Sequence, residues 1–393
     1  MEFPAFEEAL KIIEREAFVL KAEHMPLQAS CGRVVAEDVV SDIDMPPFNK
    51  SAMDGFACRR SDLGARMAII ETISAGDNPR KRIGKEECSR IMTGARVPDG
   101  ADCVVMVEHT VQDGENSIRF AWSDTQNNIA VKGEDVKRGD VVVANGTLLR
   151  PQHIAILASA GCASPLVYKQ PRVAVLNTGN EIVEPDIKPD GTCIRNSNGP
   201  QLVAQIRNIG AIPDYKGIVK DNPGIIDYAI KSALSENDIV IVTGGVSMGD
   251  FDFVPSVLKD NGFTLFFEKV AVKPGRPTVF GRKGNVFVFG LPGNPVSSFT
   301  IFELMVKPLI SRMMGCKQFF PVLRMPIGVD YSRKKADRVG WIPVLLNSEG
   351  KVIPAGYHGS AHIHSLSDAW GLMGMPVGVF SYNKGEIADV RQI

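Results

Sequence analysis

The spacing of hydrophobic and polar residues changes along the chain, and each change predicts a different kind of structure. In residues 5–22, apolar residues recur near one face between glutamates and lysines, which predicts an amphipathic helix. From about 38 to 137, short apolar runs alternate with Gly, Pro, Asp and Asn, which is typical of a β-rich domain with many turns. Residues 151–161 begin with proline and end with glycine, which predicts a helix that rejoins the first one. The β-rich part is then an insertion.

From about residue 170, continuous apolar strands such as "RVAVLNTG", "DIVIVTGG" and "NVFVFGLPG" alternate with amphipathic helices. This alternation predicts a three-layer α/β domain, with a mostly parallel sheet and helices on both faces. The long helix that starts at Pro295 is expected to bend near Pro308. After about 321, short strands and turns predict a small all-β domain. The fold class is therefore multidomain α/β, divided into 1–37 with 138–168, 38–137, 169–320 and 321–393.

Composition narrows the class of protein. The chain has 44 basic and 45 acidic residues, so nothing favours nucleic acid as the main partner. Its 7 cysteines include no C-x-x-C pair, which is neither a zinc pattern nor a disulfide framework. No apolar run reaches about 18 residues, so no membrane span is expected. The acidic, helical start is not typical of a signal peptide, and a reducing cytoplasm is the expected location.

Four polar turns follow the predicted parallel strands, at 177–184, 220–224, 243–252 and 290–299. Because parallel strands end at one edge of a sheet, these turns should meet at a single rim, where ligands of such sheets bind. In the third turn, adjacent glycines allow positive φ, and their N–H groups can form an anion-binding nest. The fourth turn leads into a helix whose free N–H groups should point at the rim. One such turn is an ordinary tight connection; four favour a binding site.

Acidic and basic residues accompany these turns. Clustered carboxylates beside phosphate-binding turns suggest a hard cation, Mg²⁺, although Asp221 could instead cap the helix that starts at Asn222-Pro223. On a strand, Lys269 and Lys273 would face the same side, and with Arg276 they would suit an oxyanion or phosphate; a solvated edge strand is the alternative. The acids that the rim would gather are Glu181, Asp221, Asp250 and Asp252.

Two further stretches need weighing. The segment "HGSAHIHS" holds His358, His362 and His364; the last two would be two apart on a strand, and we favour a solvent-facing strand over a metal site. In the insertion, polar turns surround Asp54 and Thr93, and a domain inserted there could reach the rim of another subunit. No Ser/His/Asp order, P-loop lysine motif or full G-x-G-x-x-G is present, so a hydrolase triad or a nicotinamide enzyme is unsupported.

Together these motifs resemble those of the molybdopterin molybdenumtransferase family, whose eukaryotic relative is the C-terminal domain of gephyrin. The matching stretches run in order along nearly the whole chain: "PPFNKSAMDGFA", "IMTGARVPDGADCVV", "NTGNEIV", "NSNGPQL", "TGGVSMGDFD", "KPGRPTVFG" and "GLPGNPVSSF". The resemblance implies an elongated homodimer of four-domain subunits, with a molybdopterin-binding α/β domain and a β-barrel-like C-terminal domain. It also implies molybdopterin adenylyltransferase and molybdoenzyme acceptors as partners.

The resemblance implies a reaction as well. Molybdate and adenylylated molybdopterin would enter, Mg²⁺ would assist release of AMP, and molybdenum would be inserted at the dithiolene sulfurs. The implied metal ligands are Glu181, Asp221 and Asp252. The implied catalytic residues are these three together with Asp54, Thr93, Lys269 and Lys273. Asp54 and Thr93 would come from the partner subunit. Substrate binding is expected of Ser51, Asp135, Thr243, Gly244, Gly245, Ser247, Gly249, Arg276, Pro292, Gly293, Asn294, Pro295 and Arg338.

Three alternatives remain open at this point. A tungstate-inserting paralogue would carry the same residues, because the two oxyanions have nearly equal size and charge. A molybdopterin adenylyltransferase would use the α/β domain alone, and the inserted and C-terminal domains argue against it. A scaffold in the manner of gephyrin would need a linker, and no stretch of the sequence resembles one.

Overall fold

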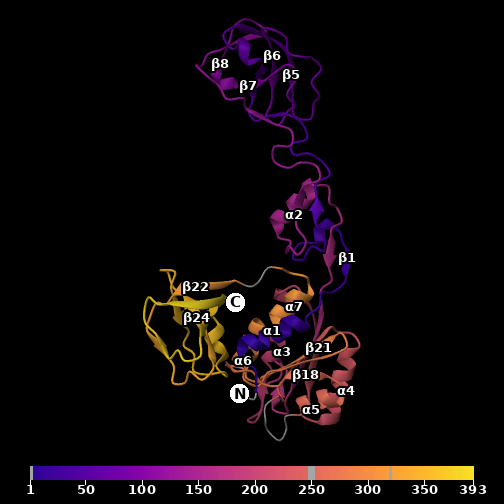
Figure 1. Ribbon diagram of the computed structural model, residues 1–393, viewed down its shortest axis with the longest axis vertical. Helices are drawn as coiled ribbons and strands as arrows, with labels where there is room; N and C mark the ends of the chain where they lie inside the picture. Colours follow the sequence, from indigo (N-terminus) through magenta and orange to yellow (C-terminus); the bar gives the residue numbers. More distant parts are fainter. Residues whose placement is uncertain (1–2, 247–252, 318–320) are drawn as a thin grey trace.

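The computed structural model describes residues 3–246, 253–317 and 321–393, and this part of the chain contains three six-stranded sheets. Figure 1 shows an elongated molecule. The sheet with β5 to β8 lies at one end, a small unit with β1 and α2 lies in the middle, and the other two sheets lie side by side at the far end. Within the described ranges, no helix is both long enough and apolar enough to cross a membrane.

The α/β unit is built on a sheet with the strand order β16-β13-β17-β21-β20-β18. The first four of these strands are parallel, while β20 is antiparallel to both β21 and β18. The prediction of a mostly parallel sheet is therefore confirmed. The strands are β13 (Arg172–Thr178), β16 (Ile212–Val219), β17 (Ile239–Thr243), β18 (Thr264–Phe267), β20 (Val279–Lys283) and β21 (Val286–Leu291).

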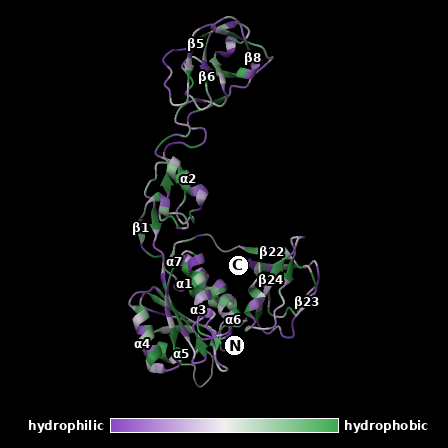
Figure 2. Cartoon of the chain, turned by 180° about the vertical axis from the view of Figure 1, so that it is seen from behind, coloured by the Kyte–Doolittle hydropathy of each residue, from purple (hydrophilic) through white to green (hydrophobic). Residues whose placement is uncertain are grey.

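Helices cover both faces of this sheet, because successive strand residues point to opposite sides. Val173 and Val175 pack with α1, α3, α6 and α7, whereas Ala174 and Leu176 pack with α4 and α5. Figure 2 shows hydrophobic residues concentrated in the helices and strands of this unit. The helices are α1 (Phe6–Glu16), α3 (Asn198–Asn208), α4 (Pro223–Leu234), α5 (Val254–Asp260), α6 (Pro295–Ile301) and α7 (Lys307–Met313).

The first helix differs from its prediction in length and in packing. It ends at Glu16 rather than near residue 22, because Ala17 is already extended with ψ 139°. Its buried residues Phe6 and Ile13 join the core of the α/β sheet instead of the unit formed with 138–168. Burying such side chains is worth about 1.5–3 kcal/mol each, which stabilises the helix against the α/β sheet. An apolar stripe predicts that a helix is covered but not by what.

The long helix from Pro295 to Met313 is interrupted before Pro308, as the sequence suggested. Residues Phe302–Val306 form a π-helical turn between α6 and α7. Proline has no N–H to donate to the preceding turn, and its ring crowds the carbonyl four residues earlier. A wider turn relieves that conflict.

The middle unit is made from two separate parts of the chain. Its core contains Val35, Val143, Leu149, Leu157 and Val167, so residues on both sides of the insertion pack together. The predicted helix at 151–161 is present as α2, and two pairs of short antiparallel strands surround it. The elements are α2 (Pro151–Ser159), β1 (Ala22–His24), β2 (Val39–Val40), β11 (Val141–Val143) and β12 (Leu166–Tyr168).

The inserted unit is β-rich as expected, but it does not start at residue 38, because Val39–Val40 pair with β11 and belong to the middle unit. Its sheet has the order β7-β4-β6-β5-β9-β8, and hydrophobic clusters centred on Phe56 and on Ile73 lie on its two faces. The strands are β4 (Gly55–Cys58), β5 (Arg66–Ile73), β6 (Glu87–Ile91), β7 (Cys103–Met106), β8 (Thr110–Gln112) and β9 (Ser117–Phe120), with the pair β3 (Lys50–Ser51) and β10 (Ile129–Ala130) beside them.

The C-terminal sheet has the order β19-β24-β26-β28-β22, and β25 pairs with β24. A bridge between Ile327, directly after β22, and Val352 of β25 links β22 back to the β24–β25 pair, so the sheet closes on itself. β19 belongs to the α/β segment, which means that the two units share a sheet. The strands are β19 (Val272–Lys273), β22 (Val322–Pro326), β24 (Val339–Leu346), β25 (Val352–Pro354), β26 (Gly371–Met375) and β28 (Ile387–Gln392), with the separate pair β23 (Tyr331–Ser332) and β27 (Ser381–Tyr382).

Candidate active site

The carboxyl ends of the four parallel strands meet at one cleft of about 710 Å³, which we call the rim cleft. All four predicted turns contribute to it, so the expected convergence is confirmed. Among the residues expected there, it is lined by Glu181, Asp221, Thr243, Gly244, Gly245, Pro292, Gly293, Asn294 and Pro295. Further lining residues lie in stretches that the sequence analysis quoted, without having been named individually as site residues; they include Asn177, Thr178, Asn196, Ser197, Asn198, Ala361 and Ile363.

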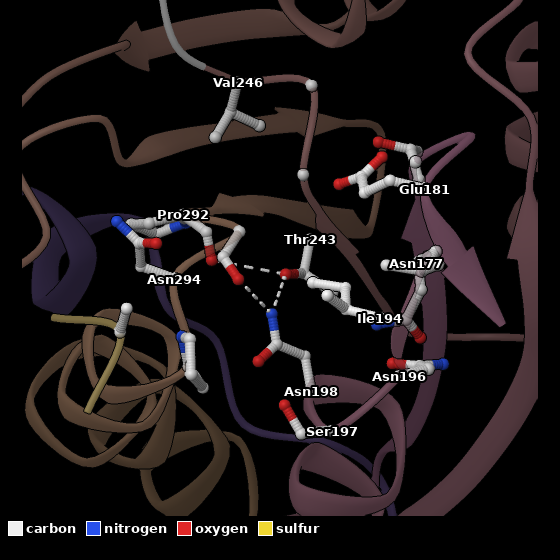
Figure 3. Close-up of a pocket in the computed structure, with 18 of the residues that line it drawn as sticks. Asn177, Glu181, Ile194, Asn196, Ser197, Asn198, Thr243, Val246, Pro292 and Asn294 are labelled. Carbon is white, nitrogen blue, oxygen red and sulfur yellow. Dashed lines mark hydrogen bonds between the residues drawn. The ribbon is translucent and has the colours of Figure 1, made fainter. Parts of the chain in front are cut away.

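Asn198, at the start of α3, holds the centre of the cleft together (Figure 3). Its side-chain Nδ2 donates to Thr243 Oγ1 at 2.9 Å and to the Gly293 carbonyl at 2.8 Å. Thr243 Oγ1 in turn donates to the Pro292 carbonyl at 3.3 Å. These bonds tie the ends of β17 and β21 to α3. Side-chain packing and hydrogen bonding thus pre-organise the floor of the cleft.

The glycine pair after β17 does what the sequence predicted for its backbone. Gly244 and Gly245 have φ values of 91° and 61°, in the left-handed region that favours glycine. A Cβ on Gly244 would lie 2.4 Å from the Thr178 carbonyl oxygen. The pair therefore lets the ends of β17 and β13 approach closely. The close contact is with the neighbouring strand, whereas the sequence suggested a ligand.

Two of the N–H groups that we expected to face a ligand are already engaged. The Gly244 N–H donates to the Leu291 carbonyl at 3.1 Å, and the Val296 N–H at the start of α6 donates to the Ser360 carbonyl at 3.0 Å. The expectation that these two groups are free for an anion was therefore wrong. Both are used to join elements, because backbone donors at strand and helix ends are satisfied wherever a carbonyl is in reach.

Glu181 and Asp221 both line the rim cleft, but neither caps a helix. Asp221 Oδ2 accepts from the Asn180 N–H at 3.1 Å, which links the first two turns. Asn222 is the residue that caps α4, because its Oδ1 accepts from the N–H groups of Gly224 and Ile225. The capping alternative for Asp221 is therefore wrong, and its carboxylate remains at the rim. The three other expected residues Ser247, Gly249 and Asp252, with Asp250, lie outside the described residues.

The donor set of the cleft fits a hard cation. Besides the two carboxylates, the side-chain oxygens Asn177 Oδ1, Thr178 Oγ1 and Asn198 Oδ1 are buried and have no hydrogen-bond partner among the described residues. Carboxylate and amide oxygens are the ligands that Mg²⁺ prefers. No group of three or more His, Cys, Asp or Glu side chains is placed to hold a metal within the described ranges, and the expected trio includes Asp252, which lies outside them.

The basic segment after β18 is not one strand. β18 ends at Phe267 and β19 covers only Val272 and Lys273, so the expectation that Lys269 and Lys273 share one face of a strand was wrong. The cis Lys273-Pro274 bond and the turn through Gly275, with φ 105°, interrupt the strand pattern. The Arg276 guanidinium lies over the Phe3 ring, 5.0 Å from its centre. These three side chains are not among the residues that line the rim cleft.

The pairing of β19 with β24 brings Arg338, which also pairs with Asp337 at 3.4 Å, close to Lys273. Lys273 pairs with Gly340 where β19 joins β24, and Arg338 Nη1 donates to the Val272 carbonyl at 3.5 Å. The sequence could not connect the two, because they are 65 positions apart. Lys273 is exposed and Arg338 is half-buried. The junction of the α/β and C-terminal units thus gathers basic side chains.

In the inserted unit, Asp54 and Thr93 are held together. Asp54 Oδ1 accepts from the Thr93 N–H at 2.6 Å and from its hydroxyl at 2.9 Å. These two hydrogen bonds lower the pKa of Asp54 below its ordinary 3.8, because they favour the charged carboxylate. Both residues are exposed. The structure therefore presents an ionised carboxylate on an ordered turn.

The other two expected residues of this region have structural partners. The Ser51 hydroxyl is buried and donates to the Met53 carbonyl at 2.5 Å. The Asp135 N–H donates to the Met45 carbonyl at 3.0 Å, and its side chain is exposed. Figure 1 places the inserted unit at the opposite end of the molecule from the α/β unit. Within one chain these residues are not part of the rim cleft.

The histidine segment also differs from its prediction. Residues Ile363–Leu366 form a 3-10 helix, not a strand, so the expectation of a strand for His362 and His364 was wrong. The ring of His358 stacks on that of His362 at 4.9 Å. The two-residue spacing of His362 and His364 was interpreted as the alternation of a strand, although the segment is helical. This segment nonetheless reaches the site, because Ser360 bonds Asn294 and Ile363 lines the cleft.

Three family models match the chain one after another. The MoeA N-terminal region (domain I and II) matches residues 5–161, the "Probable molybdopterin binding domain" matches 174–312, and the MoeA C-terminal region (domain IV) matches 330–393. The rim cleft draws most of its lining from the second of these regions and Ala361 and Ile363 from the third.

Individual relatives match over almost their whole length. A protein of Staphylococcus epidermidis named molybdopterin molybdenumtransferase is 36% identical, over 98% of this chain and 94% of that protein. A Staphylococcus aureus protein of the same name is 37% identical with the same coverage. The crystal structure of a molybdopterin biosynthesis MoeA protein from Pyrococcus horikoshii is 29% identical, covers 100% of both chains and has a TM-score of 0.87. The chain therefore belongs to the molybdopterin molybdenumtransferase family.

Proposed function

We propose that this chain, a transferase of molybdenum cofactor biosynthesis by its family, inserts molybdenum from molybdate into adenylylated molybdopterin and releases AMP. The observation that carries the proposal is the rim cleft itself. Its volume of about 710 Å³ is in the range of sites for nucleotide-sized ligands, and all four strand-end turns line it.

Mg²⁺, if bound here, would neutralise charge on the phosphates of the substrate and polarise the phosphoanhydride. Glu181 and Asp221 would hold it, with Asp252 as the third expected ligand. The partnerless oxygens of Asn177 and Thr178 lie on the same floor and are available to the ion or to donors of the substrate. Asn198 keeps the Thr243 hydroxyl and the Gly293 carbonyl in place against it.

The basic residues at the junction of the α/β and C-terminal units would bind the oxyanion substrate, molybdate. Lys273 lies in β19, which pairs with β24, and Arg338, directly before β24, donates to the Val272 carbonyl; Lys269 precedes Lys273 in the same segment. A dianion such as molybdate is best held by cationic donors, since charge-assisted hydrogen bonds are about twice as strong as neutral ones. We assign molybdate to this junction, next to the cleft that takes the pterin.

A homodimer would complete the site. Asp54 is ionised and ordered by Thr93, yet the inserted unit and the α/β unit lie at opposite ends of the chain. An exposed, oriented carboxylate that lies far from the rim cleft of its own chain suits a site shared between two subunits. We propose that Asp54 and Thr93 of one subunit close the rim cleft of the other. In a two-fold dimer, each subunit would do this for its partner.

Reconstitution tests this proposal. Purified protein is mixed with adenylylated molybdopterin, Mg²⁺ and molybdate or tungstate, and AMP and metal-loaded pterin are measured. Molybdate-dependent AMP release is expected, and the same comparison reports whether tungstate substitutes. If instead Mg-ATP and molybdopterin yield the adenylylated product, the chain is an adenylyltransferase. Absence of AMP from the adenylylated substrate contradicts the proposed function.

A further inference from the structure

The inserted unit contains a second cleft, of about 450 Å³, that the proposed reaction does not use. Two loops enclose it: the one between β5 and β6, and the one that follows β6. The second loop also carries Thr93, three positions before Arg96. We call this the basic cleft. Its lining residues are Asn78, Pro79, Arg80, Lys81, Arg82, Arg96, Val97 and Asp99.

Positive charge dominates the basic cleft. Four of its eight lining residues are Arg or Lys, against the single acid Asp99. In the part of the chain that the structure describes, Arg80, Arg82 and Arg96 form no ion pair with any carboxylate. All three are exposed and keep their donors available. Like charges gathered in one hollow raise the local anion concentration.

The backbone under these side chains is fixed. The Glu71 carboxylate accepts from the N–H groups of Arg80 and Lys81 at 3.2 and 3.1 Å, and these two hydrogen bonds hold the loop in place. Lys81 Nζ donates to the Ile70 carbonyl at 2.7 Å. Across the cleft, the Ile83 N–H donates to the Asp99 carbonyl at 2.8 Å. Pre-organised loops of this kind lower the ordering cost of binding.

Arg96 is oriented from the other side. Its guanidinium lies 5.9 Å from the centre of the Phe48 ring, and its backbone bridges to Lys50. Stacking on an aromatic face holds the planar fork while leaving its N–H donors free at the edge. Guanidinium forks match phosphate oxygens in a bidentate way. Arg80, Arg82 and Arg96 therefore offer three such forks to one ligand.

We propose that the basic cleft binds a small molecule that carries one or two phosphoryl groups. The concave shape and the volume favour a small ligand over an extended acidic peptide, which would require a longer groove. The site lies in the inserted unit and is separate from the rim cleft, whose lining comes from the α/β and C-terminal units. The proposal does not rest on the proposed reaction, because binding is measured without molybdopterin or molybdate.

Hydrogen–deuterium exchange of the full-length protein with inorganic pyrophosphate tests it. Peptides covering 78–82 and 96–99 report the basic cleft, and peptides covering 177–181 and 243–246 report the rim cleft separately. We expect pyrophosphate to slow exchange at the first pair. In the double variant Arg80→Gln/Arg96→Gln the apparent affinity read from these peptides should fall about 100-fold, since each charge-assisted contact is worth roughly tenfold. The variant should keep its molybdate-dependent AMP release at saturating substrate.

Arg119→Gln is the matched control, because Arg119 is exposed in the same unit but pairs with Asp113 and does not line the cleft. It removes one charge, as each single variant Arg80→Gln or Arg96→Gln does, and should leave the affinity within about twofold, as expected of a screened surface pair, whereas each single variant should lower it about tenfold. An equal loss in the control would show that net charge alone attracts the anion and would overturn the proposal. So would absence of protection at 78–82 and 96–99, or tighter binding of an oligo-glutamate peptide than of pyrophosphate.

Discussion

Asn198 Nδ2 donates to Thr243 Oγ1 at 2.9 Å, so a residue at the start of α3 fixes the end of β17. The same nitrogen reaches the Gly293 carbonyl at 2.8 Å and thereby includes the turn after β21. One amide group thus sets the spacing of two strand-end turns. The catalytic proposal depends on that spacing, because small displacements of positioning groups carry large costs in rate.

Asn198→Ala should therefore lower the rate of AMP release by about 100-fold, the order expected when positioning is lost by about 1 Å. Steady-state kinetics with adenylylated molybdopterin measure it. Asn261→Ala is the control, because Asn261 is also buried and also makes two side-chain hydrogen bonds, to Asp227 and Val257, outside the cleft. Equal rate losses in the two variants would mean that only stability was affected.

Gly244→Ala should destabilise the protein by about 1–3 kcal/mol, the usual cost of one residue forced into a disfavoured backbone region. Gly244 has φ 91°, and a Cβ there would meet the Thr178 carbonyl oxygen at 2.4 Å. Thermal unfolding measures the effect. Gly191→Ala is the control in the same unit, since Gly191 has no atom within 4 Å of its Cβ position and no positive φ. A Gly244→Ala protein as stable as this control would contradict the close strand approach.

The pKa of Asp54 should rise towards 3.8 in Thr93→Val, which removes the hydroxyl bond and keeps the N–H bond. The pKa of Asp54 in the folded protein lies below 3.8. The stability that its ionised form contributes is therefore fully present above pH 3.8 and is lost as the pH falls through the folded pKa. Carboxyl NMR titration measures the shift. Thr110→Val, whose hydroxyl bonds the Val107 carbonyl, should leave the pKa of Asp54 unchanged.

The shared site can be tested by mixing two inactive proteins, Asp54→Ala and Asp221→Ala. If each site combines the inserted unit of one subunit with the rim cleft of the other, half of a random mixture is heterodimer with one intact site. Activity should then recover to about a quarter of the unmutated level. Mixed and refolded samples are compared with each variant alone. No recovery in a verified heterodimer would place both residues in one chain's site and contradict the proposal.

Much of the rim could be predicted from the sequence, because continuous apolar runs predict parallel strands and their ends must meet. Glu181, Asp221 and the turns at Thr243 and Pro292 were found on that basis. Asn198 was missed because polar residues at a helix start ordinarily cap the helix, and its true partners are 45 and 95 positions away.

Residues brought together by long-range packing escaped prediction for the same reason. Arg338 is adjacent to Lys273 only because β19 pairs with β24, and Ser360 reaches the start of α6 only because the C-terminal unit packs there. The basic cleft depends on two loops meeting, which local periodicity does not report. Hydrophobic spacing specifies which faces are buried but does not specify what covers them, as α1 shows.

Molybdenum transfer at the rim cleft is tested most directly by a single-turnover measurement of AMP release from adenylylated molybdopterin, with and without molybdate. We expect release that requires molybdate and Mg²⁺, is accompanied by metal-loaded pterin, and is lost in Asp221→Asn. Release at the same rate without molybdate, or undiminished release in Asp221→Asn, would contradict the assignment of molybdenum transfer to the rim cleft.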